Sequence, residues 1–208
     1  MGTEGLIGAG RATVLAEARA VADVADQLDD SFAAAVELLR DCAGKVLVSG
    51  AGTSGTVARR LAHLLSVTGT PALYLHPADA LHGSLGAVTG TDVVIAISKG
   101  GESAELNEFA ARSAARGATT VAMTARGDST LARTAGLVAR ITTVPGADPG
   151  EAIAMGSTLA MSAWGDALAL TLMRLRGYSW AEVLFTHPAG AVGQLAEEPD
   201  ALPPLGAG

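Results

Sequence analysis

The sequence predicts a doubly wound α/β domain built on a five-stranded parallel sheet that is flanked by helices. Short apolar runs alternate along the chain with longer segments of helical periodicity, which is typical of parallel sheets with right-handed crossovers. The runs are KVLVS, PALYL, DVVIAIS, ATTVAMT and GLVARIT, at residues 45–49, 71–75, 92–98, 118–124 and 136–142. Because these runs are apolar along most of their length, both faces of the sheet need a covering layer of helices.

The first 43 residues predict an additional helical arm. Residues 8–42 contain no proline, and their apolar side chains recur at spacings of three and four, which indicates one or two amphipathic helices. The side chains in this pattern are Val21, Val24, Leu28, Phe32, Ala35 and Leu39. We expect the arm, residues 1–43, to pack on the core or in a subunit interface.

Helical segments follow the apolar runs within the predicted central domain, residues 44–197. The stretch GAGTSG is expected to form a loop that leads into the first of these helices. The expected helices lie at residues 56–69, 102–117, 129–135 and about 154–176. Ser129 is the expected N-cap of the third helix. Short helical pieces complete the domain, and the Pro- and Gly-rich residues 198–208 are expected to be a flexible tail.

The composition fits a compact domain with a core of small aliphatic side chains. Hydrophobic residues make up 49% of the 208 residues, whereas aromatic residues make up only 3%. The net charge of −7 and the absence of a Lys/Arg run argue against nucleic-acid binding. Asp166 interrupts the most apolar long stretch, so a core helix is favoured there over a membrane span. Cys42 is the single cysteine, which fits a reducing compartment, and we expect a cytoplasmic protein.

Two glycine-rich loops follow the first and third apolar runs, and each opens a helix. They read SGAGTSG and SKGGES, at residues 49–55 and 98–103. Ligands of such sheets bind beyond the carboxyl ends of the strands, where hydroxyls and amides at a helix N-terminus suit a phosphate monoester. The candidate contacts are Gly52, Thr53, Ser54, Ser98, Lys99, Gly100, Gly101 and Ser103. The alternative is that the glycines only form turns and the serines only cap helices.

The first loop also satisfies the dinucleotide pattern G-x-G-x-x-G. Its glycines are Gly50, Gly52 and Gly55. That motif expects an acidic residue at the end of the next strand, where this chain has His76, and Asp79 lies further along. An oxidoreductase that binds NAD(P) is therefore a weaker alternative.

Longer stretches around these loops resemble the SIS-domain sugar-phosphate isomerases, and most closely the arabinose 5-phosphate isomerases. They are VLVSGAGTSGTVARRLA, TGTPALYLHPADALHGSLGAVTGTDVVIAIS, GGESAEL and THPAGAVG. The resemblance implies the SIS fold and aldose–ketose isomerisation through an enediol(ate). It also implies a homo-oligomer, either a dimer or a tetramer, with sites near subunit interfaces. It implies no organic cofactor and no required metal, and we expect no nucleic-acid or membrane partner.

The resemblance also implies roles for single residues. Ser98, Ser103 and Ser54 would hold the phosphate, Glu105 would be the catalytic carboxylate, and His187 would be the second acid/base group. His76 and His82 flank a loop near the carboxyl edge of the sheet. With His187 they could form a three-histidine metal site, although their spacing alone does not indicate one. His82 is instead a candidate to contact the sugar hydroxyls.

This chain departs from the subgroup at three positions. Thr53 stands where the subgroup usually has a lysine, and Lys99 where it typically has an asparagine. Gly146 stands where a loop glutamate is usual, and Glu151 is the candidate to replace that catalytic carboxylate. The subgroup often carries a pair of CBS domains, and we expect none within these 208 residues. A hexulose 6-phosphate isomerase and a non-catalytic sugar-phosphate-binding module therefore stay open as alternatives.

Overall fold

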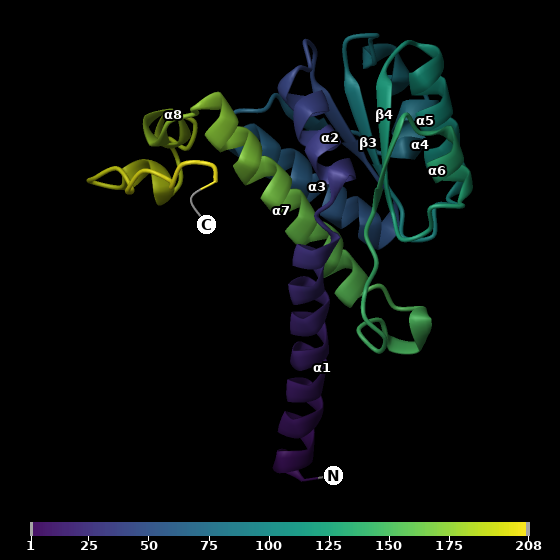
Figure 1. The fold of residues 1–208 in the computed structure, drawn as a ribbon, viewed down its shortest axis with the longest axis vertical. Coiled ribbons are helices and arrows are strands. Elements are labelled where there is room, and N and C mark those ends of the chain that lie inside the picture. Colours follow the sequence, from purple (N-terminus) through teal and green to yellow (C-terminus); the bar gives the residue numbers. More distant parts are fainter. Residues whose placement is uncertain (1, 207–208) are drawn as a thin grey trace.

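The computed structural model describes residues 2–206 and contains the predicted five-stranded parallel sheet (Figure 1). The strands are β1 (Val46–Ser49), β2 (Ala72–Tyr74), β3 (Val93–Ile97), β4 (Thr119–Thr124) and β5 (Leu137–Arg140). Their order across the sheet is β2-β1-β3-β4-β5, and every neighbouring pair is parallel. The strand order therefore reverses between β1 and β3, and in sheets of this kind the ligand binds at the carboxyl ends of the two strands where the order reverses.

Helices cover both faces of the sheet and create two cores, as the apolar runs predict. One face carries α2 (Asp30–Arg40), α3 (Gly52–Val67) and α7 (Gly156–Arg176). The other face carries α4 (Pro77–Leu81), α5 (Ala104–Ala115) and α6 (Thr130–Thr134). Successive residues of β3 alternate between the two cores, since Ile95 joins the first and Val94 and Ala96 join the second.

The N-terminal helix α1 (Thr3–Asp23) projects from the body as a free arm (Figure 1). Residues 2–15 are all exposed, and only the C-terminal part of α1, around the buried Ala20, packs near α7. A 3₁₀ turn at Val24–Gln27 joins α1 to α2. The predicted helical arm is thus present, and most of its first helix contacts no other part of the described chain.

The segment after α7 extends the molecule on another side (Figure 1). Gly177 ends α7 in the left-handed conformation, and Ser179 forms a capping box with Glu182 at the start of α8 (Trp180–Phe185). Further 3₁₀ turns lie at Ser84–Ala87, Pro149–Glu151 and Val192–Gln194. The tail has no regular structure from 195 to 206, although the Trp180 indole donates a hydrogen bond to the Asp200 carbonyl at 2.9 Å. Within residues 2–206, no helix is both long and apolar enough to cross a membrane.

Candidate active site

The first glycine loop is shorter than the sequence predicts, because α3 already begins at Gly52. Gly52 has φ +55°, and Gly50 and Gly55 bring their backbones into direct contact. A Cβ atom at Gly55 would lie 2.8 Å from the Gly50 carbonyl oxygen, so only glycine fits this turn. Thr53 and Ser54 are therefore residues of the first helical turn, and we correct the predicted loop accordingly.

The N-termini of α3 and α5 lie at the switch point and lack side-chain caps. Ala51 and Ser103 are the N-cap residues, and neither side chain accepts a hydrogen bond from its helix. In contrast, Asp29 caps α2 and the predicted cap Ser129 caps α6. The alternative that the loop serines only cap helices is therefore wrong for Ser103. Both helix ends keep free N–H donors, which favour an anion.

The second loop, which we call the serine loop (residues 98–103), is held in a fixed shape by Gly101. Gly101 has φ +68°, and its N–H donates to Ser98 Oγ at 3.1 Å. A Cβ atom at this position would lie 2.1 Å from Ser129 Oγ. The amide of Gly101 is thus used inside the loop, whereas Gly100 is exposed and its N–H has no partner within residues 2–206.

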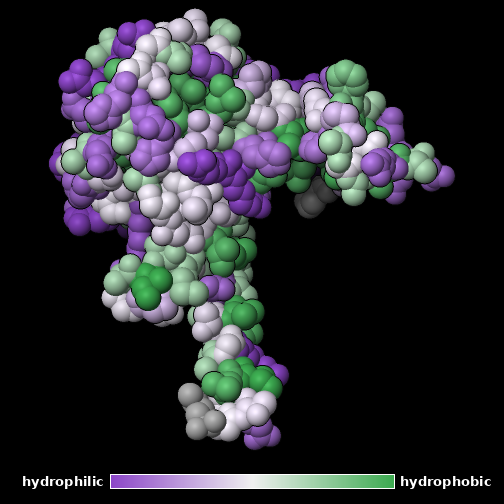
Figure 2. All heavy atoms as spheres, turned by 180° about the vertical axis from the view of Figure 1, so that it is seen from behind, coloured by the Kyte–Doolittle hydropathy of each residue, from purple (hydrophilic) through white to green (hydrophobic). Residues whose placement is uncertain are grey.

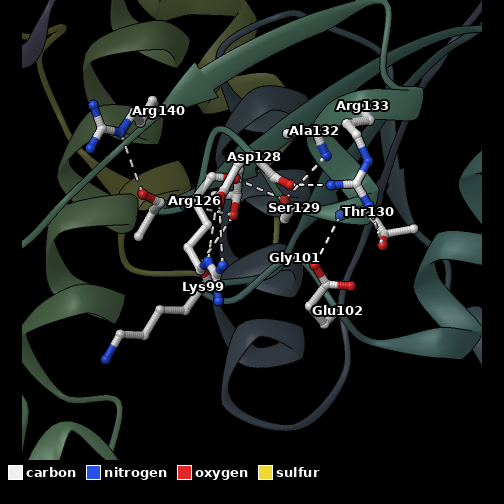
Figure 3. A network of polar contacts seen from close by, with 12 residues as sticks. Lys99, Gly101, Glu102, Arg126, Asp128, Ser129, Thr130, Ala132, Arg133 and Arg140 are labelled. Carbon is white, nitrogen blue, oxygen red and sulfur yellow. Dashed lines mark hydrogen bonds and ion pairs between the residues drawn. The ribbon is translucent and has the colours of Figure 1, made fainter.

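The segment between β4 and α6 supports the outer side of the serine loop (Figure 3). The Lys99 carbonyl accepts hydrogen bonds from the N–H of Ala125 at 3.0 Å and from Thr124 Oγ1 at 3.1 Å. Glu102 accepts one from the Thr130 N–H at 3.0 Å. The hydrogen bonding by Thr130 lowers the pKa of Glu102 below its ordinary value. Glu102 is therefore a structural carboxylate of this loop.

Glu105 occupies the first turn of α5, just beyond the serine loop. Its side chain is exposed, and it forms no ion pair or side-chain hydrogen bond with any described residue. A carboxylate at this point is stabilised by the helix dipole. Glu105 is therefore free to act on a molecule bound at the N-terminus of α5.

The side chain of Lys99 leads away from Glu102 and Ser129 (Figure 3) and forms an ion pair with Asp148. The distance from Lys99 Nζ to Asp148 Oδ2 is 2.6 Å, and the Asp148 side chain is fully buried. Burial alone would raise the pKa of Asp148, but the hydrogen bonds from Lys99, Ser157 and Met155 outweigh it and hold the pKa at about 2. The sequence interpretation missed Asp148, although it lies in the loop where a carboxylate was expected.

The same loop brings Glu151 towards the serine loop. Glu151 has φ +56° and is the one residue other than glycine with positive φ within residues 2–206. Such backbone strain clusters at functional sites. The Lys99 ammonium lies 3.5 Å from the Glu151 carbonyl oxygen, and the Glu151 side chain is exposed.

The predicted catalytic His187 follows α8, the helix that lies beyond the C-terminal end of α7 (Figure 1). Asp148 contacts the start of α7, whereas His187 follows α8, beyond the C-terminal end of α7. Since α7 has 21 residues, its two ends are about 30 Å apart. His187 Nδ1 lies 2.7 Å from the Val183 carbonyl oxygen. Within one chain, His187 and Glu105 are therefore not brought together.

The two other candidate histidines, His76 and His82, lie at the two ends of α4. His76 caps α4, where its Nδ1 accepts a hydrogen bond from the Ala78 N–H at 3.2 Å. His82 is exposed at the end of α4, and its neighbours Leu81 and Gly83 line a surface cavity with Arg112 of α5. No group of three His, Cys, Asp or Glu residues suited to a metal ion occurs among the described residues.

A family model described as the SIS domain matches residues 38–171. The chain belongs to the SIS-domain family. This match covers the sheet, both loops and most of α7, so the G-x-G-x-x-G loop of this SIS domain is part of a sugar-isomerase fold and not evidence of a dinucleotide site.

Curated relatives of this SIS domain include proteins named arabinose 5-phosphate isomerase. The GutQ protein of Salmonella typhi is 36% identical over 209 residues, which cover 97% of this chain and 65% of that protein. The KdsD protein of Escherichia coli K12 is 36% identical over 186 residues, which cover 89% of this chain and 57% of that protein. The chain thus spans less than two thirds of the length of these relatives.

Solved structures of SIS proteins have the same fold over whole chains. E. coli CFT073 c3406 in complex with arabinose 5-phosphate superposes with a TM-score of 0.86 at 34% identity, and the match covers 90% of this chain and all of that one. A candidate sugar-phosphate isomerase of Listeria monocytogenes superposes with a TM-score of 0.87 at 31% identity, covering 91% of this chain and all of that one. The predicted fold class is confirmed.

Proposed function

We propose that this SIS-domain chain is an aldose–ketose isomerase that interconverts arabinose 5-phosphate and ribulose 5-phosphate. The observation that carries the proposal is the unpaired Glu105 beside two uncapped helix N-termini at the switch point of the sheet. This arrangement joins an anion site to a free carboxylate, which are the two elements that a sugar-phosphate isomerase needs. The names of the curated relatives and the arabinose 5-phosphate ligand of the E. coli structure support the same substrate.

In the proposed reaction the phosphate accepts hydrogen bonds from neutral donors of the two loops. These donors are the hydroxyls of Thr53, Ser54, Ser98 and Ser103 together with the free N–H groups of Gly52 and Gly100. The open-chain aldose then extends along the first turn of α5. Glu105 removes the proton from C2, the C–H electrons form the C1=C2 bond, and the carbonyl oxygen takes the negative charge. Return of the proton to C1 gives the ketose.

The proposal requires a second acid/base group that moves a proton from O2 to O1, and we assign it to His187. Because His187 follows α8, beyond the far end of α7 from the Asp148 loop, it would serve a neighbouring copy. Glu151, on the loop beside Lys99, would be a third catalytic group, and His82 would contact the sugar hydroxyls. Phosphorylated sugars are made and used inside cells, so the proposal includes a cytoplasmic location.

We further propose that the arm of residues 1–43 forms the interface of a homo-oligomer, in the form of a tetramer. Leu6, Ile7, Val14 and Leu15 on α1 are each more than half exposed, and apolar groups line the projecting arm in Figure 2. Helices in proteins gain most of their stability from the packing of an apolar face, and packing against another copy would bury these side chains.

The test is solvent exchange with arabinose 5-phosphate in D₂O. Proton transfer by Glu105 predicts deuterium at the exchanging carbon of both sugars and conversion between them, followed by NMR. Deuterium exchange into a hexulose 6-phosphate but not into arabinose 5-phosphate would favour the alternative of a hexulose 6-phosphate isomerase. Tight binding of sugar phosphates without exchange of any carbon-bound proton would contradict an isomerase and support a non-catalytic binding module. The replacement of the subgroup's lysine and glutamate by Thr53 and Gly146 favours that alternative.

A further inference from the structure

Lys99 joins the serine loop to the loop that precedes α7. Its carbonyl is held by Ala125 and Thr124, as described, while its ammonium crosses to Asp148 at 2.6 Å and to the Glu151 carbonyl at 3.5 Å. One residue therefore contacts both the candidate anion loop and the candidate catalytic loop.

Asp148 ties the same contact to the start of α7. Its Oδ1 accepts hydrogen bonds from the N–H of Met155 at 2.8 Å and of Ser157 at 3.0 Å, while Oδ2 faces Lys99. A fully buried carboxylate is stable only when it is paired and hydrogen-bonded, so loss of the Lys99 partner would leave an uncompensated charge. The loop therefore depends on Lys99 for its position.

We propose that Asp148 is a positioning residue that acts through Lys99 and fixes the Glu151 loop against the serine loop. The pair also neutralises the one lysine of the serine loop, so the anion meets mainly neutral N–H and O–H donors. The effect of the Lys99–Asp148 pair on catalysis rests on the proposed isomerase function, whereas its effect on the position of the loop does not.

The chain offers a matched control at the opposite edge of the sheet. Lys45 Nζ lies 2.8 Å from Asp92 Oδ2, and Asp92 also accepts hydrogen bonds from the N–H groups of Lys45 and Thr89. The exposed fractions of the side chains are nearly the same in the two pairs, 30% and 1% for Lys45 and Asp92 against 29% and 0% for Lys99 and Asp148. Asp92 precedes β3, away from the strand ends that carry the site.

The experiment compares Asp148→Asn, Lys99→Met, their double variant and Asp92→Asn. Asparagine still accepts from the α7 amides but no longer holds the lysine. We expect Asp148→Asn to lower kcat for arabinose 5-phosphate by about ten- to a hundredfold, because small displacements of a catalytic loop are costly. The KM should not rise, since Lys99 becomes available to the anion. Asp148→Asn should cause no further loss of kcat when Lys99 is already methionine, and Asp92→Asn should leave kcat and KM unchanged.

Two measurements do not require turnover. Amide hydrogen exchange of residues 143–155 should accelerate in Lys99→Met, and the dissociation constant of inorganic phosphate should not increase in Asp148→Asn. Unchanged exchange in this loop, additive kinetic effects or weaker phosphate binding in Asp148→Asn would each overturn the inference. If the wild-type protein turns over no sugar phosphate, the proposed function fails, and the exchange and phosphate data still decide the role of the pair.

Discussion

The hydroxyl of Ser103 stands at the start of α5 without a partner among the described residues, although serine is a favoured cap. This open cap fits the proposal that the Ser103 hydroxyl binds the sugar phosphate. The close backbone contact of Gly50 with Gly55 and the left-handed turn at Gly101 fix the two glycine loops. The hydroxyl and N–H donors of these loops are therefore in position before a ligand binds. In the proposed function these groups form an array of preorganised neutral donors for the phosphate.

Ser103→Ala should therefore weaken substrate binding and leave the chemical step nearly intact. Loss of one hydrogen bond to a charged group predicts a rise in KM of about tenfold or more for arabinose 5-phosphate, with kcat little changed. Steady-state kinetics measure both values. Asp29→Ala is the control, because it removes the cap of α2 and should lower the melting temperature without raising KM. An unchanged KM in Ser103→Ala would remove this hydroxyl from the phosphate site.

Substitution of the two carboxylates Glu102 and Glu105 should have clearly different effects on activity. Glu105→Gln should lower kcat by about a hundred- to ten-thousandfold and preserve sugar-phosphate binding, because the amide cannot take the C2 proton. Glu102→Gln should retain most of the activity, since its partner is the Thr130 N–H, which an amide oxygen can still meet. Turnover and calorimetric binding measure the two effects. Full activity of Glu105→Gln would exclude this residue as the base.

The five strands follow from their short apolar runs, and most helices follow from the three- and four-residue spacing of their apolar side chains. The start of α3 does not, since Gly52 to Gly55 have low helix propensity and their place in the helix depends on backbone contact between Gly50 and Gly55. The projection of α1 away from the body could not be predicted either, because the spacing of apolar residues defines a helix face but not the surface that covers this face. Asp148 lies in a loop without periodicity, and its role depends on Lys99, which is distant in sequence.

At the scale of the two glycine loops, Gly101 of the serine loop and Gly52 at the start of α3 provide a matched pair of substitutions. Both have positive φ, but a Cβ at Gly101 would meet Ser129, whereas nothing lies within 4 Å of one at Gly52. Gly101→Ala should therefore destabilise the fold by more than the ~1 kcal/mol expected from φ alone at Gly52. Urea unfolding measures both variants. Equal losses would indicate that the loop adjusts around the new methyl group.

Across the whole molecule, the buried Asp92 and Asp148 predict a loss of stability in acid. Burial raises the pKa of each, but hydrogen bonds from Lys45 and Lys99 and from backbone N–H groups hold both pKa values at about 2, below the ordinary 3.8. Unfolding therefore takes up protons below about pH 4, so the stabilisation is complete above that pH and disappears as the pH falls towards 2. Each carboxylate contributes about 2 kcal/mol to the free energy of unfolding above about pH 4.

Urea titrations at about pH 5 and pH 3 measure this loss. Asp148→Asn should lose less stability between the two pH values than the wild type, because one of the two proton-binding carboxylates is absent. An equal loss in both proteins would contradict the depressed pKa of Asp148.

The free arm predicts that assembly can be broken without touching the core. Ile7→Glu combined with Val14→Glu should shift the protein to smaller oligomers and lower its activity, because the proposed site needs His187 from another copy. Light scattering and turnover measure the two effects. Ala12→Glu is the control, since residue 12 lies on nearly the opposite side of α1 and gains one negative charge, as each position of the double variant does. A wild-type monomer with full activity would contradict both the interface and the shared site.

The helix α7 connects the Lys99–Asp148 contact at its first turn to the segment that carries His187 beyond its last turn. The length of α7 therefore sets the distance and the relative orientation of these two segments. A single residue inserted in α7 would rotate everything after it by about 100° and advance it by about 1.5 Å, whereas seven residues would restore the angle to within about 20°. Related chains that vary this length should do so in steps close to whole turns, and a comparison of their helix lengths would reveal that restriction without any measurement of activity.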